Sequence, residues 1–139
     1  MPTPDSLCSS VQEKIRLSLQ PLSMLATGGI RPDLLLTGKK LRTHLAECLV
    51  DFAGRSTRLV HACAAVEIVH TASLCHDDMI DGALVRRHLP ALHASAGTAA
   101  AVLTGDLLYC QAVCILTETR ELDLVSDFAA KVAEVCRTE

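Results

Sequence analysis

Hydrophobic positions recur every three or four residues along most of this chain, which is the spacing of amphipathic helices. The spacing predicts helices over residues 5–26, 38–52, 57–81, 97–118 and 122–137. Asp5 or Ser6 is the candidate N-cap of the first helix, and Pro21 is expected to kink or end it. The pattern therefore predicts an all-α bundle of five to six helices.

The third predicted helix, residues 57–81, is apolar around most of its circumference, so we expect it at the centre of the bundle. Gly82 is a suitable stop signal. The second helix carries leucines on one side, at positions 41, 45 and 49. Residues 82–96 are expected to form a loop, and Gly105 is expected to let another backbone approach the fourth helix.

The amino-acid composition and net charge exclude several classes of protein. The chain has 139 residues, which suits one domain, and it is 50% hydrophobic but only 2% aromatic. A net charge of −3 provides no basic field for nucleic acid. No signal peptide and no uninterrupted apolar run of about 20 residues is evident, so we expect no transmembrane segment. Seven scattered cysteines indicate buried thiols in a reducing compartment, with the cytoplasm as the expected location.

Three acids end the third predicted helix. Asp77 and Asp81 are one helical turn apart, and Asp78 lies beside them. Carboxylates at this spacing repel one another unless a cation joins them, and Mg²⁺ prefers carboxylate and phosphate oxygens. The alternative is an ordinary solvated acidic helix end.

Two basic clusters flank these acids in the sequence. Lys39 and Arg42 lie on one face at the start of the second helix, where free backbone N–H groups also favour an anion. Arg86 and Arg87 follow Asp81 closely and could clamp a diphosphate or simply neutralise the acids. Together with the apolar helices between them, these clusters predict a ligand with diphosphate groups and a hydrocarbon tail.

The segments GKKLR, VEIVHTASLCHDDMID, RRHLPALH and AVLTGDLLYCQA resemble, in this order, the N-terminal half of the trans-prenyltransferases (polyprenyl diphosphate synthases). The resemblance covers residues 37–112. It implies the isoprenoid-synthase fold, an all-α bundle around a cavity, and usually a homodimer. It also implies Mg²⁺-dependent 1′–4 condensation of isopentenyl diphosphate with an allylic prenyl diphosphate.

The resemblance also implies residue roles. Asp77, Asp78 and Asp81 would hold Mg²⁺ against the allylic diphosphate, which Arg86 would also contact. A second group would hold the diphosphate of isopentenyl diphosphate: Lys39, Arg42, His70 and Arg87. Ala72 and Ser73 occupy positions that help to set the cavity floor, and their small size implies a product longer than farnesyl.

This chain departs from the family pattern in four ways. Thr37 and His88 stand where glycines are usual, and Thr43 stands where a proline is usual. Family members are about twice as long and carry a second aspartate-rich motif, which the acids after residue 120 do not supply. We therefore expect a single partial domain over residues 1–139, which is a truncated product, a fragment or one component of a two-chain enzyme. The alternative function is a non-catalytic subunit that acts through oligomerisation and diphosphate binding.

Overall fold

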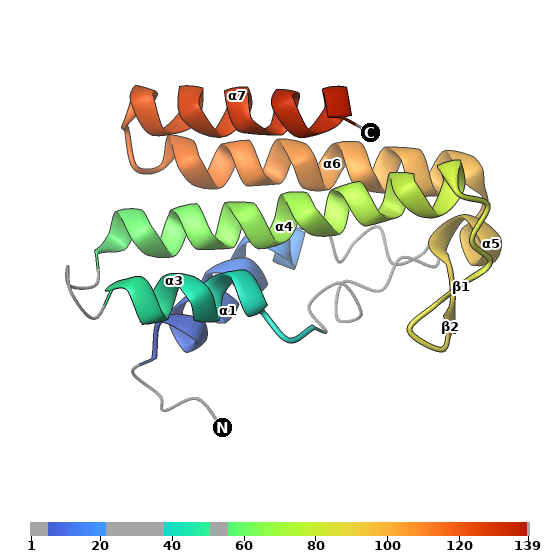
Figure 1. The fold of residues 1–139 in the computed structure, drawn as a ribbon, viewed down its shortest axis with the longest axis horizontal. Coiled ribbons are helices and arrows are strands. Elements are labelled where there is room, and N and C mark those ends of the chain that lie inside the picture. Colours follow the sequence, from blue (N-terminus) through green and yellow to red (C-terminus); the bar gives the residue numbers. More distant parts are fainter. Residues whose placement is uncertain (1–5, 22–37, 51–55, 139) are drawn as a thin grey trace.

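The computed structural model describes residues 6–21, 38–50 and 56–138. Figure 1 shows the elements, which are α1 (Leu7–Leu19), α3 (Leu41–Val50), α4 (Thr57–Ile80), β1 (Val85–Arg86), β2 (Leu89–Pro90), α5 (Leu92–Ala96), α6 (Thr98–Thr117) and α7 (Leu122–Thr138). The predicted all-α bundle is confirmed for the described part of the chain.

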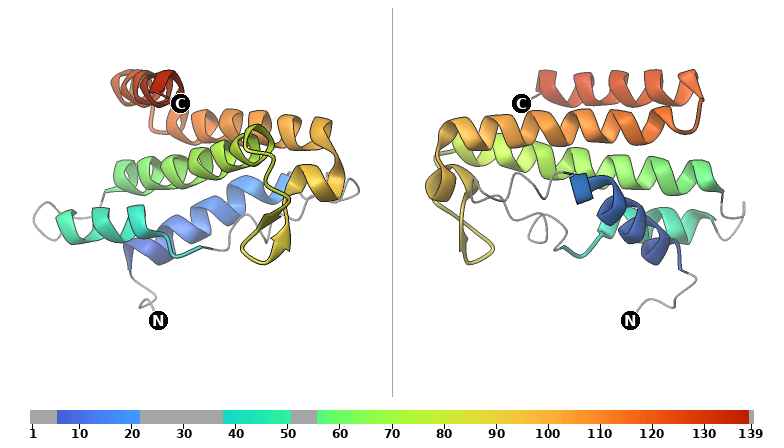
Figure 2. Two further views of the ribbon diagram at one scale, coloured as in Figure 1. Left: turned by 45° about the vertical axis from the view of Figure 1, so that its right-hand side comes forward. Right: turned by 180° about the vertical axis from the view of Figure 1, so that it is seen from behind.

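Helix α4 lies at the centre, as its apolar circumference predicts. It packs along the length of α6 on one side and against α1 and α3 on the other, while α7 covers the outer side of α6 (Figures 1 and 2). By length and composition alone, α4 and α6 could each cross a membrane. Each is instead the main packing partner of the other, and their buried faces form most of the core.

Helix α1 begins where the sequence predicts and ends earlier. The Ser6 hydroxyl accepts a hydrogen bond from the Ser9 backbone N–H, which makes Ser6 the N-cap. The helix ends at Leu19 in a 3₁₀ turn that reaches Pro21. The rest of the predicted helix, residues 22–26, lies outside the described residues.

Helix α3 turns its leucines outward. Leu41, Leu45 and Leu49, hereafter the leucine stripe, are 66%, 64% and 66% exposed. The side of α3 that faces the core instead carries Thr43, which is fully buried, and Ala46. Leucine spacing thus identifies the helix but not its buried side.

Residues 82–96 form more than the predicted loop. A two-stranded antiparallel hairpin pairs Val85 with Pro90 and Arg86 with Leu89, and the short helix α5 follows it. The hairpin turn places Arg87 at φ 50° and His88 at φ 66°. Two-residue hairpin turns require positive φ, which matches strand twist but suits glycine best. His88 therefore holds a conformation that glycine would adopt without strain.

Gly105 does allow a close approach, but by a side chain. A Cβ at this position would lie 2.2 Å from Nε2 of His76, so the imidazole ring of α4 occupies the space beside the α6 backbone. His76 Nε2 is 3.5 Å from Asp106 Oδ1. The side chain of Asp106 is 62% exposed.

The cysteines are not uniformly buried. All seven carry free thiols, but only Cys8, Cys63 and Cys75 are buried. The other four are exposed: Cys48, Cys110, Cys114 and Cys136. The expectation of buried thiols is wrong for these four, because α3, α6 and α7 each turn one apolar side away from the core.

Candidate functional site

The acidic end of α4 is divided by burial. Asp78 is buried, whereas Asp77 is half-buried and Asp81, the C-cap residue of α4, is exposed. Both oxygens of Asp78 are held by Arg86: Nε donates to Oδ2 over 2.6 Å, and Nη2 lies 2.6 Å from Oδ1. This fork geometry raises the pKa of Arg86, chiefly through the hydrogen bond to Asp78. The predicted neutralisation of the acids by arginine is thus realised for this pair.

The fit of the three aspartates to a metal ion is partial. Within the described residues, no group of three His, Cys, Asp or Glu side chains is gathered around one point. Carboxylate oxygens are nevertheless the ligands that Mg²⁺ prefers, and this ion commonly takes only one or two of them beside phosphate oxygens and water. Asp77 and Asp81, one turn apart, provide that number without the Asp78–Arg86 pair.

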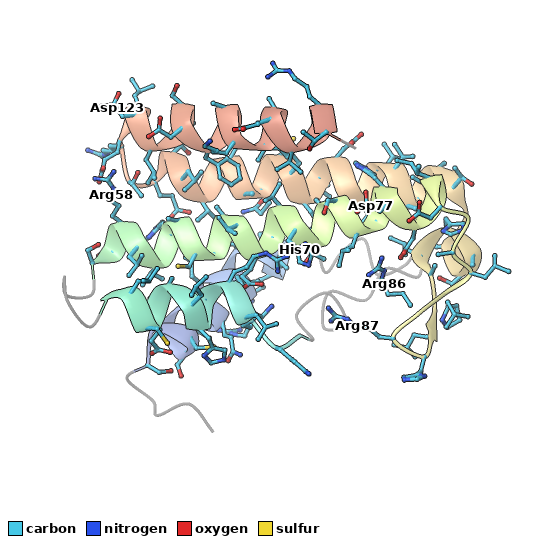
Figure 3. All side chains as sticks on the ribbon, viewed as in Figure 1. Arg58, His70, Asp77, Arg86, Arg87 and Asp123 are labelled. Atoms are coloured by element: carbon cyan, nitrogen blue, oxygen red, sulfur yellow. The ribbon has the colours of Figure 1, made fainter. Side chains whose placement is uncertain are left out.

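The hairpin brings its second arginine to the start of α3. A Cβ on Gly38 would lie 3.3 Å from Nη1 of Arg87, so the guanidinium reaches the backbone that leads into α3. Lys39 and Arg42 are exposed in this same segment. Figure 3 shows Arg86 and Arg87 on one side of α4, between the hairpin and the N-terminal end of α3, with His70 on α4 beside them. Two basic clusters far apart in the sequence therefore meet.

His70 lies within the electric field of these cations. Burial lowers the pKa of His70, and Arg42, Arg87 and Arg86 lower it further, while Glu67 acts in the opposite direction. A neutral imidazole can accept a proton or donate a hydrogen bond near neutral pH. His70 is thus placed as a polar group on the wall of a cationic site.

Sequence reasoning missed three residues beneath this site. Glu67 is buried on α4, and its Oε1 accepts hydrogen bonds from the backbone N–H of Thr43 over 3.2 Å and from its hydroxyl over 3.0 Å. Lys40, which precedes α3, is also buried and has φ 47°. The available signal was a lone glutamate within the apolar run LVHACAAVEIV, because an isolated charge at a core position needs a partner.

The two residues assigned to the cavity floor differ in burial. Ala72 belongs to the buried apolar core. Ser73 is half-buried, and its hydroxyl donates to the backbone carbonyl of His70 over 2.9 Å. Both are small side chains on the central helix, one turn before the aspartates.

Comparison with known proteins gives this arrangement its context. The polyprenyl synthetase family model matches residues 31–139. This chain belongs to the polyprenyl synthetase family. The match includes both basic clusters, the aspartates and the whole of α4.

Relatives in this family share both sequence and fold. A geranylgeranyl diphosphate synthase of Sulfolobus acidocaldarius is 42% identical over 82 residues, 58% of this chain and 25% of the relative. The geranylgeranyl pyrophosphate synthetase of the archaeon Geoglobus acetivorans matches with a TM-score of 0.77 and 31% identity, covering 91% of this chain and 44% of that one.

A Caulobacter crescentus polyprenyl synthase, solved with calcium and isoprenyl diphosphate, matches with a TM-score of 0.64 and 27% identity. It covers 94% of this chain and 43% of that one. The chain thus has the helical fold of isoprenoid synthases and spans less than half the length of these relatives.

Proposed function

We propose that this chain carries the diphosphate-binding half of a trans-prenyltransferase site, which acts in isoprenoid biosynthesis. The observation that supports the proposal most is the meeting of cations from separate elements beside the aspartate end of α4. Arg87 reaches the backbone at Gly38, and Arg86 grips Asp78. Such an array suits two diphosphate groups on apolar substrates.

The site residues form two groups by position, one for each proposed diphosphate. Asp77 and Asp81 would hold Mg²⁺ on the allylic diphosphate, while Asp78 stays paired with Arg86. The bound ion would neutralise the charge of the departing pyrophosphate. Arg86, already beside these acids, would share its guanidinium between Asp78 and that diphosphate. The exposed cations at the start of α3 and just before it, Arg42 and Lys39, would bind isopentenyl diphosphate together with His70 and Arg87.

The proposed reaction is a 1′–4 condensation. The allylic carbon–oxygen bond breaks, and the electron pair leaves with pyrophosphate, whose growing charge Arg86 stabilises. The alkene of isopentenyl diphosphate then forms the new carbon–carbon bond, and a proton passes to the released pyrophosphate. The cations at α3 and the hairpin hold the second substrate in line for this attack.

The small residues on α4 support a product longer than farnesyl. Ala72 and Ser73 are both small, and an aromatic ring at either position would occupy more room beside the central helix. In a chain that turns over, Ala72→Phe is expected to shorten the product, as measured by chromatography of the released prenyl alcohols. Unchanged product length in Ala72→Phe and Ser73→Phe would contradict this assignment.

Ligand-induced thermal stabilisation tests the proposal. Pyrophosphate or a prenyl diphosphate with Mg²⁺ is expected to raise the melting temperature, because a ligand that binds only the folded state stabilises it. Asp77→Ala should abolish the shift. Asp123→Ala is the matched control, because Asp123 is exposed on α7 at the far end of the bundle (Figure 3). No shift with either ligand would refute diphosphate binding.

A second candidate function is that of a non-catalytic subunit. The exposed leucine stripe on α3 favours it, as does α7, where no residue is buried. Apolar surface of this kind usually marks association. This function predicts a stable homo-oligomer, or a complex with a second chain, and no prenyl transfer by the chain alone. Incorporation of labelled isopentenyl diphosphate by the purified chain would exclude it.

A further inference from the structure

Thr43 and Glu67 join α3 to α4 through a contact hereafter named the Thr43–Glu67 clasp. Thr43 is the third residue of α3 and is fully buried, and Glu67 is buried on α4. Oε1 of Glu67 accepts both the backbone N–H and the hydroxyl of Thr43, over 3.2 and 3.0 Å. Two donors from one residue fix the Arg42–Thr43 peptide plane and the Thr43 rotamer at the same time.

A carboxylate at this depth is stable only when its charge is compensated. The first turn of α3 offers free N–H groups and the positive end of the helix dipole. The ammonium group of Lys40 is buried nearby, where attraction to Glu67 partly offsets the lowering of the Lys40 pKa by burial. A cavity of about 10 Å³ lined in part by Lys40 and Glu67 has room for about one water molecule.

The position of the clasp links the two substrate-facing groups. Arg42 directly precedes Thr43 on α3, and His70 lies one turn after Glu67 on α4. The clasp joins the two helices that carry these side chains, and Arg42 lowers the pKa of His70. Holding Thr43 on Glu67 therefore sets how the first turn of α3 faces His70.

We propose that Glu67 is a positioning residue that acts through Thr43. It holds Arg42 beside His70, so that both side chains can bind the same diphosphate. This inference rests on the proposed function for its ligand, but the placement of Arg42 is independent of any ligand. A proline at position 43, the residue usual in the family, could donate neither bond. The clasp is thus a feature of this chain and replaces the rigidity of proline with two hydrogen bonds.

The His70 imidazole is the readout for the position of Arg42. The charged groups around it are Arg42, Glu67, Arg87 and Arg86. Thr43→Val keeps the charge of Glu67 but removes a clasp bond, so Arg42 moves away and the pKa of His70 rises toward 6.5. Glu67→Gln removes the negative charge, so the pKa of His70 falls. NMR titration of the full chain measures these opposite pKa shifts. They distinguish the effect of moving Arg42 from the effect of removing the Glu67 charge.

Matched variants complete the experiment. Thr104→Val removes another buried threonine hydroxyl, which donates within α6 to Ala100, and should leave the pKa of His70 unchanged. Thr43→Ser keeps both donors and should match the wild type. Arg42→Ala should raise the pKa of His70, with no further rise when Thr43→Val is added. A pKa unchanged in Thr43→Val but raised in Arg42→Ala would overturn the proposal. Thr43→Ala replaces Thr43→Val if the valine variant does not fold.

Pyrophosphate binding gives the second arm. With Mg²⁺ present, Thr43→Val should weaken the pyrophosphate Kd about three- to tenfold by calorimetry, while Thr104→Val should not change it. Equal affinity of the wild type, Thr43→Val and Arg42→Ala for pyrophosphate would overturn the role of the clasp in binding. Absence of binding by the wild type would instead refute the proposed function, and the His70 titration would still decide where Arg42 is held.

Discussion

At the scale of single residues, the ion pair of Asp78 and Arg86 determines how the acidic motif is presented. A buried carboxylate needs a partner, and the guanidinium supplies two contacts of 2.6 Å to it. Only the outer acids, Asp77 and Asp81, are left to face an incoming ion. Arg86 is therefore both a structural partner of the motif and a proposed ligand of the substrate.

Arg86→Ala is expected to destabilise the fold, because it leaves the Asp78 carboxylate buried without its guanidinium. We expect a loss of about 2 kcal/mol in the free energy of unfolding, reduced from the cost of a fully buried pair because Arg86 is partly exposed. Urea denaturation measures it. Asp78→Asn should recover part of the loss in the double variant. Arg58→Ala, which breaks an exposed pair with Glu121, is the control and should cost less.

His88→Gly is expected to stabilise the chain, because the residue has φ 66° and a left-handed conformation strains a side chain that bears a Cβ. The free energy of unfolding should rise by about 0.5 kcal/mol. The greater conformational freedom of glycine in the unfolded chain offsets part of the strain that is removed. Thermal and urea unfolding measure it. Leu84→Gly, at an exposed position without positive φ, should instead lose stability.

At the scale of helices, carboxylates on one helix cap or hold the end of another. Glu47 of α3 accepts the Leu7 backbone N–H at the start of α1 over 2.8 Å, as Glu67 of α4 accepts that of Thr43. Glu118, which follows α6, binds Lys14 of α1 and lies 3.3 Å from Nε2 of His61 on α4. These contacts fix α1, α3, α4 and α6 relative to one another.

The Glu118 junction predicts a pH-dependent contribution to stability. The hydrogen bond from Lys14 is the main cause that lowers the pKa of Glu118 below 4.5. A carboxyl group whose pKa is depressed by folding stabilises the fold above its unfolded pKa, and this contribution is lost as the pH falls through the folded pKa. Glu118→Gln should therefore cost about 0.5 kcal/mol at pH 7, because the site is exposed, and less near pH 3.

Unfolding curves at several pH values measure this contribution. Glu134→Gln is the matched control, since Glu134 pairs with Lys131 within one exposed helical turn over 2.8 Å. That pair should contribute only a few tenths of a kcal/mol. A cost for Glu118→Gln that is the same at both pH values would contradict the junction.

At the scale of the whole molecule, the exposed apolar surface is the main departure from a self-contained bundle. The leucine stripe lies on the outer side of α3, and α7 packs on α6 without burying a single residue. The chain spans less than half the length of the solved relatives that it matches. We expect the uncovered apolar surface on α3 to associate with a second copy of this chain.

Replacing the leucine stripe tests this surface. The triple variant Leu41→Gln, Leu45→Gln, Leu49→Gln should shift the chain toward monomer in sedimentation velocity. Each substitution should change the free energy of unfolding by no more than about 0.5 kcal/mol, because these side chains are mostly exposed within the chain. Leu122→Gln, at an 82% exposed position on α7, is the control for lost apolar surface. An unchanged sedimentation profile would show that the stripe is not the interface.

The sequence by itself determined the helices and the residue types of the site. Helical spacing, the cap at Ser6 and the unbroken apolar run of α4 are local properties, so the element bounds of α4, α6 and α7 follow from them closely. The aspartates and both basic clusters were identifiable because charge in an apolar segment is visible without coordinates.

Tertiary structure decided which face each helix buries and which charges meet. The leucine stripe turned outward because Thr43, held by Glu67, occupies the buried side of α3. The hairpin determined that Arg86 goes to Asp78 and Arg87 to the start of α3. Such contacts join residues remote in sequence and depend on which pairing compensates buried charge, so no local periodicity encodes them.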